Sequence, residues 1–222
     1  MYRPQLDWLH DGRSIEHWAI AAWNRADESV VSQGAAMVEL AKVRDQIVAA
    51  PDFRGHEMVW IAPYIGPDDS ATVFVVVIHS TVRGGAQGGT RFCQYESMAE
   101  VLSDSLRLSE GMTRKCALAG LWWGGGKSVI ARTSNMTTAY EADGPHRQHL
   151  FSKFGEFVSQ LGGVYYAAED MGTVTADMDC ILASSRFVTC IDRKKGGSGN
   201  PSPFTAQAVY LGLATSIKIL EP

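Results

Sequence analysis

Apolar side chains recur every three or four residues in several segments, a spacing that predicts amphipathic helices. The segment 97–114 begins with a capping box, in which Ser97 precedes Glu100 by three positions. In the segment 202–217, Ser202 is the expected N-cap and Pro203 takes the first helical position, where proline favours helix initiation. Helices are therefore expected at 30–48, 97–114, 150–161, 176–183 and 202–217, the first within an N-terminal helical extension over residues 1–54.

Short runs rich in β-branched and aromatic residues predict strands between these helices. The strands are expected at 58–62, 72–79, 128–131, 164–168 and 187–191. The turn-forming residues 65–70 predict a hairpin between the first two strands, and Gly124–Gly126 are expected to form a loop before the third. Strands that alternate with helices predict an α/β fold, a mixed sheet flanked by helices.

Composition narrows the class of protein. The 222 residues, 45% of them hydrophobic, can build a sizeable core and allow one domain plus part of another. A net charge of −4, with no basic block longer than residues 193–195, argues against nucleic acid as a partner. No segment has the pattern of a signal peptide or a membrane span. Four cysteines without a CxxC pair indicate free thiols, so we expect a cytoplasmic protein with no membrane partner.

Two lysines and an aspartate stand beside clustered glycines. Lys115 and Lys127 each precede apolar sequence, so a partly desolvated cleft is expected in which each lowers the pKa of the other. One lysine then serves as a base near neutral pH and the other holds an anion, while Asp170 orients or relays protons to the base. This chemistry suits proton transfer at an amine or carbonyl carbon that bears a carboxylate. The alternatives are solvated surface lysines and glycines that only form turns.

Other motifs are weaker. Gly124-Gly125-Gly126-Lys127-Ser128 resembles the end of a phosphate-binding loop, but the required earlier glycine is displaced by one residue. His146 and His149 lack further ligands, so no metal is expected. The remaining acidic residues of this region, Asp177 and Asp179, are interpreted as solvated helix charges.

Four motifs in order, Gly88–Arg91, Gly111–Lys115, Gly124–Lys127 and Ala168–Thr173, resemble those of the glutamate/leucine/phenylalanine/valine dehydrogenase family. Residues 199–206 are similar to the segment that leads into that family's cofactor domain. The resemblance covers roughly residues 55–217 and is strongest to the leucine and phenylalanine branch.

The resemblance implies oxidative deamination of an L-amino acid to a 2-oxo acid and ammonia, with NAD as the hydride acceptor. It assigns Lys127 as the general base and Asp170 as its partner in proton transfer. Lys115 would bind the substrate carboxylate, helped by the backbone amides of Gly88 and Gly89. Small-molecule amino acids and 2-oxo acids are thus the expected partners, and a homo-oligomer is expected.

The resemblance also divides the chain. Residues 55–195 would form the substrate-binding and dimerisation domain, and residues 196–222 a hinge and the first helix of a Rossmann domain. Thr205, in that helix, would lie near the nicotinamide. Because the glycine fingerprint of an NAD-binding domain is missing, we expect the chain alone not to turn over.

Gln87 departs from the family pattern, since leucine-type members carry an apolar residue there and glutamate-type members a lysine. A substrate with a neutral side chain is therefore expected. The alternative function is a short, non-redox module that binds an amino acid or a 2-oxo acid.

Overall fold

The structure, a computed structural model, describes residues 21–24, 29–32, 45, 47–133, 136, 138–141 and 144–220. Its centre is a seven-stranded mixed sheet in the order β2-β1-β3-β4-β6-β5-β7. The strands are β1 (Ala21–Asn24), β2 (Ser29–Ser32), β3 (Met58–Ile65), β4 (Ala71–Ser80), β5 (Ala86–Gln94), β6 (Gly124–Arg132) and β7 (Tyr165–Glu169). Strand β5 runs parallel to both of its neighbours, β6 and β7, and the other strand pairs are antiparallel. The predicted hairpin is confirmed as β3 and β4.

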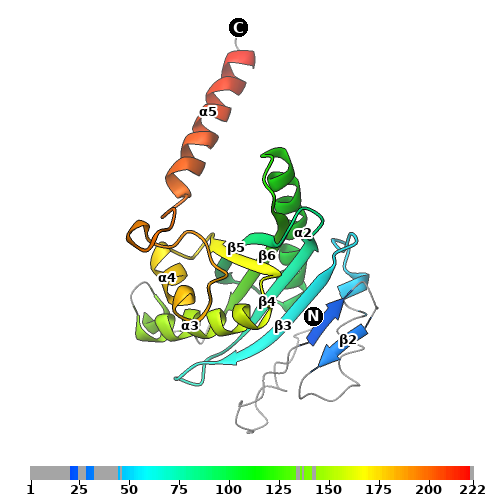
Figure 1. Ribbon diagram of the computed structural model, residues 1–222, viewed down its shortest axis with the longest axis vertical. Helices are drawn as coiled ribbons and strands as arrows, with labels where there is room; N and C mark the ends of the chain where they lie inside the picture. The colour runs from blue at the N-terminus through cyan, green and yellow to red at the C-terminus, as the bar shows by residue number, and fades with distance from the viewer. Residues whose placement is uncertain are drawn as a thin grey trace.

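Helices cover both faces of this sheet (Figure 1). One face carries α2 (Met98–Leu118), which the side chain of Ser97 caps by accepting a hydrogen bond from the backbone N–H of Glu100. The other face carries α3 (Pro145–Gln160) and α4 (Thr175–Ser184). Short 3₁₀ turns follow β6 and α4, at Thr138–Tyr140 and Arg193–Lys195. The predicted α/β fold with a mixed sheet between helices is thus confirmed.

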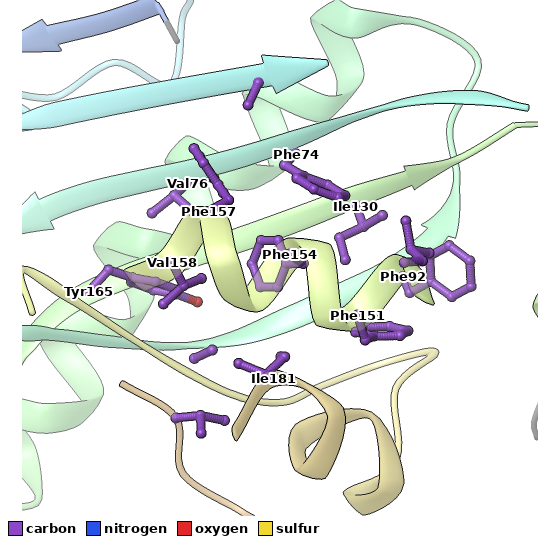
Figure 2. Close-up of a cluster of buried hydrophobic side chains, with 14 of the residues drawn as sticks. Phe74, Val76, Phe92, Ile130, Phe151, Phe154, Phe157, Val158, Tyr165 and Ile181 are labelled. Atoms are coloured by element: carbon purple, nitrogen blue, oxygen red, sulfur yellow. The ribbon is translucent and has the colours of Figure 1, made fainter. Parts of the chain in front are cut away.

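The larger core lies between the sheet and α3 (Figure 2). Alternate residues of a strand share a face, so Phe74 and Val76 of β4 point to the same side as Ile130 of β6. They pack against the aromatic side of α3, where Phe154 meets Phe74 edge to face at 5.2 Å. A second cluster joins the opposite side of β4 and β6 to Leu102 and Leu106 of α2.

Three predicted elements are wrong in part. Residues 21–24 and 29–32 form strands that extend the sheet by pairing β1 with β3, so this part of the N-terminal extension is not helical. The predicted strand at 187–191 is reduced to a single bridge between Ala167 and Val188. Gly124–Gly126 lie within β6 rather than in a loop, because strand pairing to β4 and β5 continues through them. Most of the predicted 30–48 helix lies outside the described residues.

Helix α5 (Ser202–Leu220) extends away from the sheet and its covering helices (Figure 1). None of its residues is buried, although its composition is strongly apolar. No described helix is long and apolar enough to cross a membrane.

Candidate active site

Lys127 is a buried cation in the middle of the sheet. It occupies β6 on the same side as Val129, which faces α2, and only 3% of the residue is exposed. Its Nζ lies 2.8 Å from Oδ2 of Asp170, in the loop that follows β7. Burial lowers the pKa of Lys127, and the neighbouring Arg91 lowers it further, whereas Asp170 acts in the opposite direction. The structure therefore brings the expected base and its acidic partner into direct contact.

Asp170 accepts hydrogen bonds from two cations. Besides the Lys127 contact, its Oδ2 accepts a bond from Nε of Arg91 at 2.9 Å. Burial by itself would raise the pKa of Asp170, but Lys127 and Arg91 together hold it below its ordinary value. The two cations therefore favour the ionised form of Asp170, while burial disfavours the charged form of Lys127.

The loop that carries Asp170 is anchored to the sheet and to α3. The hydroxyl of Thr173 accepts a bond from the Asp170 N–H at 2.8 Å and contacts the carbonyl of Thr90 at 3.0 Å. Gly172 adopts a φ of +82°, and a Cβ there would lie 1.9 Å from the Phe92 carbonyl oxygen. Only glycine fits this turn, which fixes Asp170 at the carboxyl end of β7, beside the middle of β5 and β6.

Arg147, on α3, anchors the same loop from the helix side. Its Nη2 donates to the carbonyl of Gly172 at 2.7 Å, and its guanidinium makes two bonds to Asp177, at 2.7 and 2.8 Å. The guanidinium also lies over the rings of Phe92 and Phe151. Asp177 is only 4% exposed, so its interpretation as a solvated helix charge is wrong: it neutralises Arg147 and accepts the Val174 N–H at the start of α4.

Gly88 and Gly89 bring three backbone segments together in β5. A Cβ on Gly88 would lie 1.8 Å from the Gly126 carbonyl oxygen, and one on Gly89 would lie 2.5 Å from Cβ of Asp170. The β5–β6 register pairs Gln87 with Gly125 and Thr90 with Ser128, with an interruption at the two glycines. These glycines are therefore strand residues rather than turns, and they permit close approach of Lys127 and Asp170.

We expect Gly88→Ala to lower the free energy of unfolding by roughly 1–3 kcal/mol, since strands β5 and β6 would have to separate to admit a methyl group. Urea unfolding followed by circular dichroism measures this loss. Gly111→Ala is the matched control. Gly111 lies in α2, and a Cβ added there would have nothing within 4 Å, so about 1 kcal/mol of stabilisation is expected. Equal effects of the two substitutions would contradict the close approach.

Lys115 lies in the last turn of α2 and is exposed. The end of α2 rests on β6, where a Cβ on Gly125 would lie 2.2 Å from the backbone nitrogen of Thr113. The cation that lowers the pKa of Lys127 is Arg91, so the expected pairing of two lysines is replaced by a lysine and an arginine. Lys115 and Lys127 lie on the same side of the sheet, since α2 covers the face to which Lys127 points.

Gln87 and Thr205 complete the expected residues. The Gln87 amide, in β5, donates to the hydroxyl of Thr189 at 3.1 Å. Thr205 is exposed on α5, where its hydroxyl contacts the carbonyl of Pro201, the residue just before the helix. Because Thr205 lies exposed on α5, which extends away from the sheet, we assign no NAD contact to the described residues. Among the residues that the structure describes, no cluster of ligands for a metal is found.

Arg91 was predicted only as the last residue of the Gly88–Arg91 motif, and Asp104 was not predicted as a site residue. Arg91 bridges Asp170 to Asp104, which accepts its Nη1 at 2.6 Å and the Tyr95 hydroxyl at 2.7 Å. A signal was present, because Asp104 lies among the buried positions of α2 between Leu102 and Ser105. A carboxylate in that position requires a partner.

Fold and site together define an α/β domain that carries a buried lysine–aspartate ion pair on one sheet face. Residues 67–186 match the family model of the Glu/Leu/Phe/Val dehydrogenase dimerisation domain. The chain belongs to the Glu/Leu/Phe/Val dehydrogenase family.

Several dehydrogenases are similar in sequence. The leucine dehydrogenase of Geobacillus stearothermophilus is 43% identical over 150 residues, which are 68% of this chain and 39% of that protein. The valine dehydrogenase of Streptomyces coelicolor is 38% identical over 169 residues, 76% of this chain and 43% of that protein. The chain therefore spans about two fifths of the length of the curated relatives it matches.

Solved structures support the same fold. The L-tryptophan dehydrogenase from Nostoc punctiforme aligns with a TM-score of 0.53 and 29% identity, covering 80% of this chain and 43% of that one. The hetero-hexameric glutamate dehydrogenase from Thermus thermophilus aligns with a TM-score of 0.55 over 71% of this chain and 40% of that one, at 21% identity, and shows the fold alone.

Proposed function

We propose that this chain provides the substrate site of an amino-acid dehydrogenase, which converts an L-amino acid with a neutral side chain into its 2-oxo acid and ammonia with NAD as the acceptor. The observation that carries the proposal is the buried contact between Lys127 and Asp170 at 2.8 Å. Burial favours the neutral form of Lys127, and a neutral amine accepts a proton. Membership of the family, whose relatives include leucine and valine dehydrogenases, supports the same chemistry.

Each protein group has one role in this proposal. Neutral Lys127 removes a proton from the amino group of the substrate and releases it to solvent; neutral again, it removes a proton from the water that adds to the imine carbon. Asp170 stays ionised and keeps the Lys127 amine aimed at the substrate. Lys115 binds the substrate carboxylate, and the backbone amides of Gly88 and Gly89 assist it.

The role of Lys115 is tested by binding of a 2-oxo acid to the chain. We expect Lys115→Met to weaken binding of the 2-oxo acid of leucine at least tenfold, because a charged hydrogen bond to a carboxylate contributes about 1.5–3 kcal/mol. Isothermal titration calorimetry measures the affinity. Lys153→Met, which removes a partly buried lysine of α3 that pairs with Glu156, should leave the affinity unchanged. Equal affinity of the Lys115 variant and the unaltered chain would contradict this role.

Gln87 supports a neutral substrate side chain. A substrate with an acidic side chain would need a cation at this position to pair with its second carboxylate. Gln87 offers only an amide, which is already hydrogen-bonded to Thr189. We expect the 2-oxo acids of leucine and phenylalanine to bind more tightly than 2-oxoglutarate, and Gln87→Lys to improve binding of 2-oxoglutarate. A preference of the unaltered chain for 2-oxoglutarate would contradict the proposal.

We further propose a homo-oligomer in the cytoplasm. The matched family model describes a dimerisation domain, which supports self-association. All four cysteines are free, in keeping with a reducing compartment. Light scattering coupled to gel filtration tests the oligomer, and a monomer at all concentrations would contradict it.

A further inference from the structure

Arg91 joins the acidic partner of Lys127 to α2. Its Nε donates to Oδ2 of Asp170 at 2.9 Å, and its Nη1 donates to Oδ2 of Asp104 at 2.6 Å. Asp104 is held in turn by the Tyr95 hydroxyl and by Arg107. The guanidinium therefore has a fixed position between the loop after β7 and the middle of α2.

Two cations share one oxygen of Asp170. Lys127 and Arg91 both contact Oδ2, at 2.8 and 2.9 Å. Arginine keeps its charge throughout the accessible pH range, whereas a buried lysine titrates. When Lys127 loses its proton, Arg91 still neutralises Asp170, so the neutral lysine does not leave an unpaired carboxylate in the sheet.

The charged groups that face Lys127 come from three segments. Asp170 comes from the loop after β7, Arg91 from β5 and Asp104 from α2. Burial of Lys127 is the largest influence on its pKa; Arg91 lowers this pKa, and both aspartates raise it. Arg91 is thus the cation in this set that opposes protonation of the lysine.

We propose that Arg91 is a positioning residue that holds Asp170 in place and keeps Lys127 available as a proton acceptor. This inference rests on the proposed function, since it assumes that Lys127 is the base. Arg91 contacts no reacting atom and acts only through Asp170 and Lys127. The residue therefore sets the pH range in which the site works.

NMR titration of the Lys127 side chain in the 222-residue chain tests the inference. The Nζ signal, assigned by its loss in Lys127→Met, reports the protonation midpoint. Arg91→Met should raise this midpoint, so that the neutral fraction at a fixed pH falls about threefold or more. Asp104→Asn removes an anion and should lower the midpoint, the opposite direction. Arg91→Lys should keep the midpoint closer to that of the unaltered chain than Arg91→Met does.

Arg107→Met is the matched control, because Arg107 also binds Asp104 but is exposed and makes no recorded contact with Asp170. It should leave the midpoint in place, and backbone NMR spectra verify the fold of every variant. Suppose that the midpoint of Lys127 is low in the unaltered chain and that Arg91→Met leaves it unchanged or lowers it. That result would overturn the role of Arg91 alone. An ordinary lysine midpoint in the unaltered chain would overturn the proposed function as well.

Discussion

Lys127→Met should lower the rate of amino-acid oxidation by about 10²–10⁴-fold, the usual contribution of a positioned general base. The methionine retains the length and apolar stem of the lysine but cannot accept a proton. The assay uses a hybrid in which the 150 aligned residues of this chain replace their counterparts in the Geobacillus stearothermophilus leucine dehydrogenase, and follows NAD reduction with leucine.

The same substitution should not destabilise the fold at neutral pH. Because the pKa of Lys127 is lowered in the folded state, the unfolded chain binds more protons between that lowered pKa and the ordinary value near 10.4. Lys127 thus costs stability below this window, and the cost disappears as the pH rises through it. The stability of the unaltered chain relative to Lys127→Met should therefore increase as the pH rises through this window. Lys153→Met is the control for both measurements, and near-normal oxidation by the Lys127 variant would refute its role.

Arg147→Met should lower the free energy of unfolding by about 3–5 kcal/mol, the range for removing one partner of a buried ion pair. The substitution leaves Asp177, at 4% exposure, without its guanidinium and frees the carbonyl of Gly172. Chemical denaturation monitored by tryptophan fluorescence gives the value. Since Gly172 belongs to the loop of Asp170, the affinity for 2-oxo acids should fall as well.

Arg114→Met provides the comparison for Arg147. Arg114 pairs with Glu110 on the exposed side of α2, where an ion pair contributes no more than about 1 kcal/mol. The double variant Arg147→Met/Asp177→Leu should recover part of the lost stability, because it removes the unpaired buried charge. A loss in Arg147→Met as small as that in Arg114→Met would contradict the anchoring role.

The sequence determines most of the fold through local signals. The capping box at Ser97 and the apolar period of 150–161 identified α2 and α3, and the turn at 65–70 identified the β3–β4 hairpin. The glycines at 124–126 were predicted to form a loop because glycine favours turns locally, whereas here they allow Thr113 of α2 and the backbone of Ser80 and Gly84 to approach β6. Strand pairing with distant segments places residues 124–126 in β6, and no local sequence pattern indicates that pairing.

The site was predictable where its chemistry lies in contiguous motifs. Lys127 and Asp170 were assigned from the residues around them, and the structure brings them together. Arg91 and Asp104 are 13 positions apart and meet only because α2 folds over β5. Asp177 was misread for a similar reason: its partner Arg147 is 30 residues away, on another helix.

The central claim is that the sheet face with Lys127 binds the substrate between Lys115 and Lys127. NMR spectra of the chain with isotope-labelled lysine side chains, titrated with the 2-oxo acid of leucine, test it most directly. We predict that the Lys115 and Lys127 signals move with one shared dissociation constant, while those of Lys153 on α3 and of the exposed Lys218 on α5 stay in place. Unmoved signals of Lys115 and Lys127, or equal movement of all four lysines, would contradict the account.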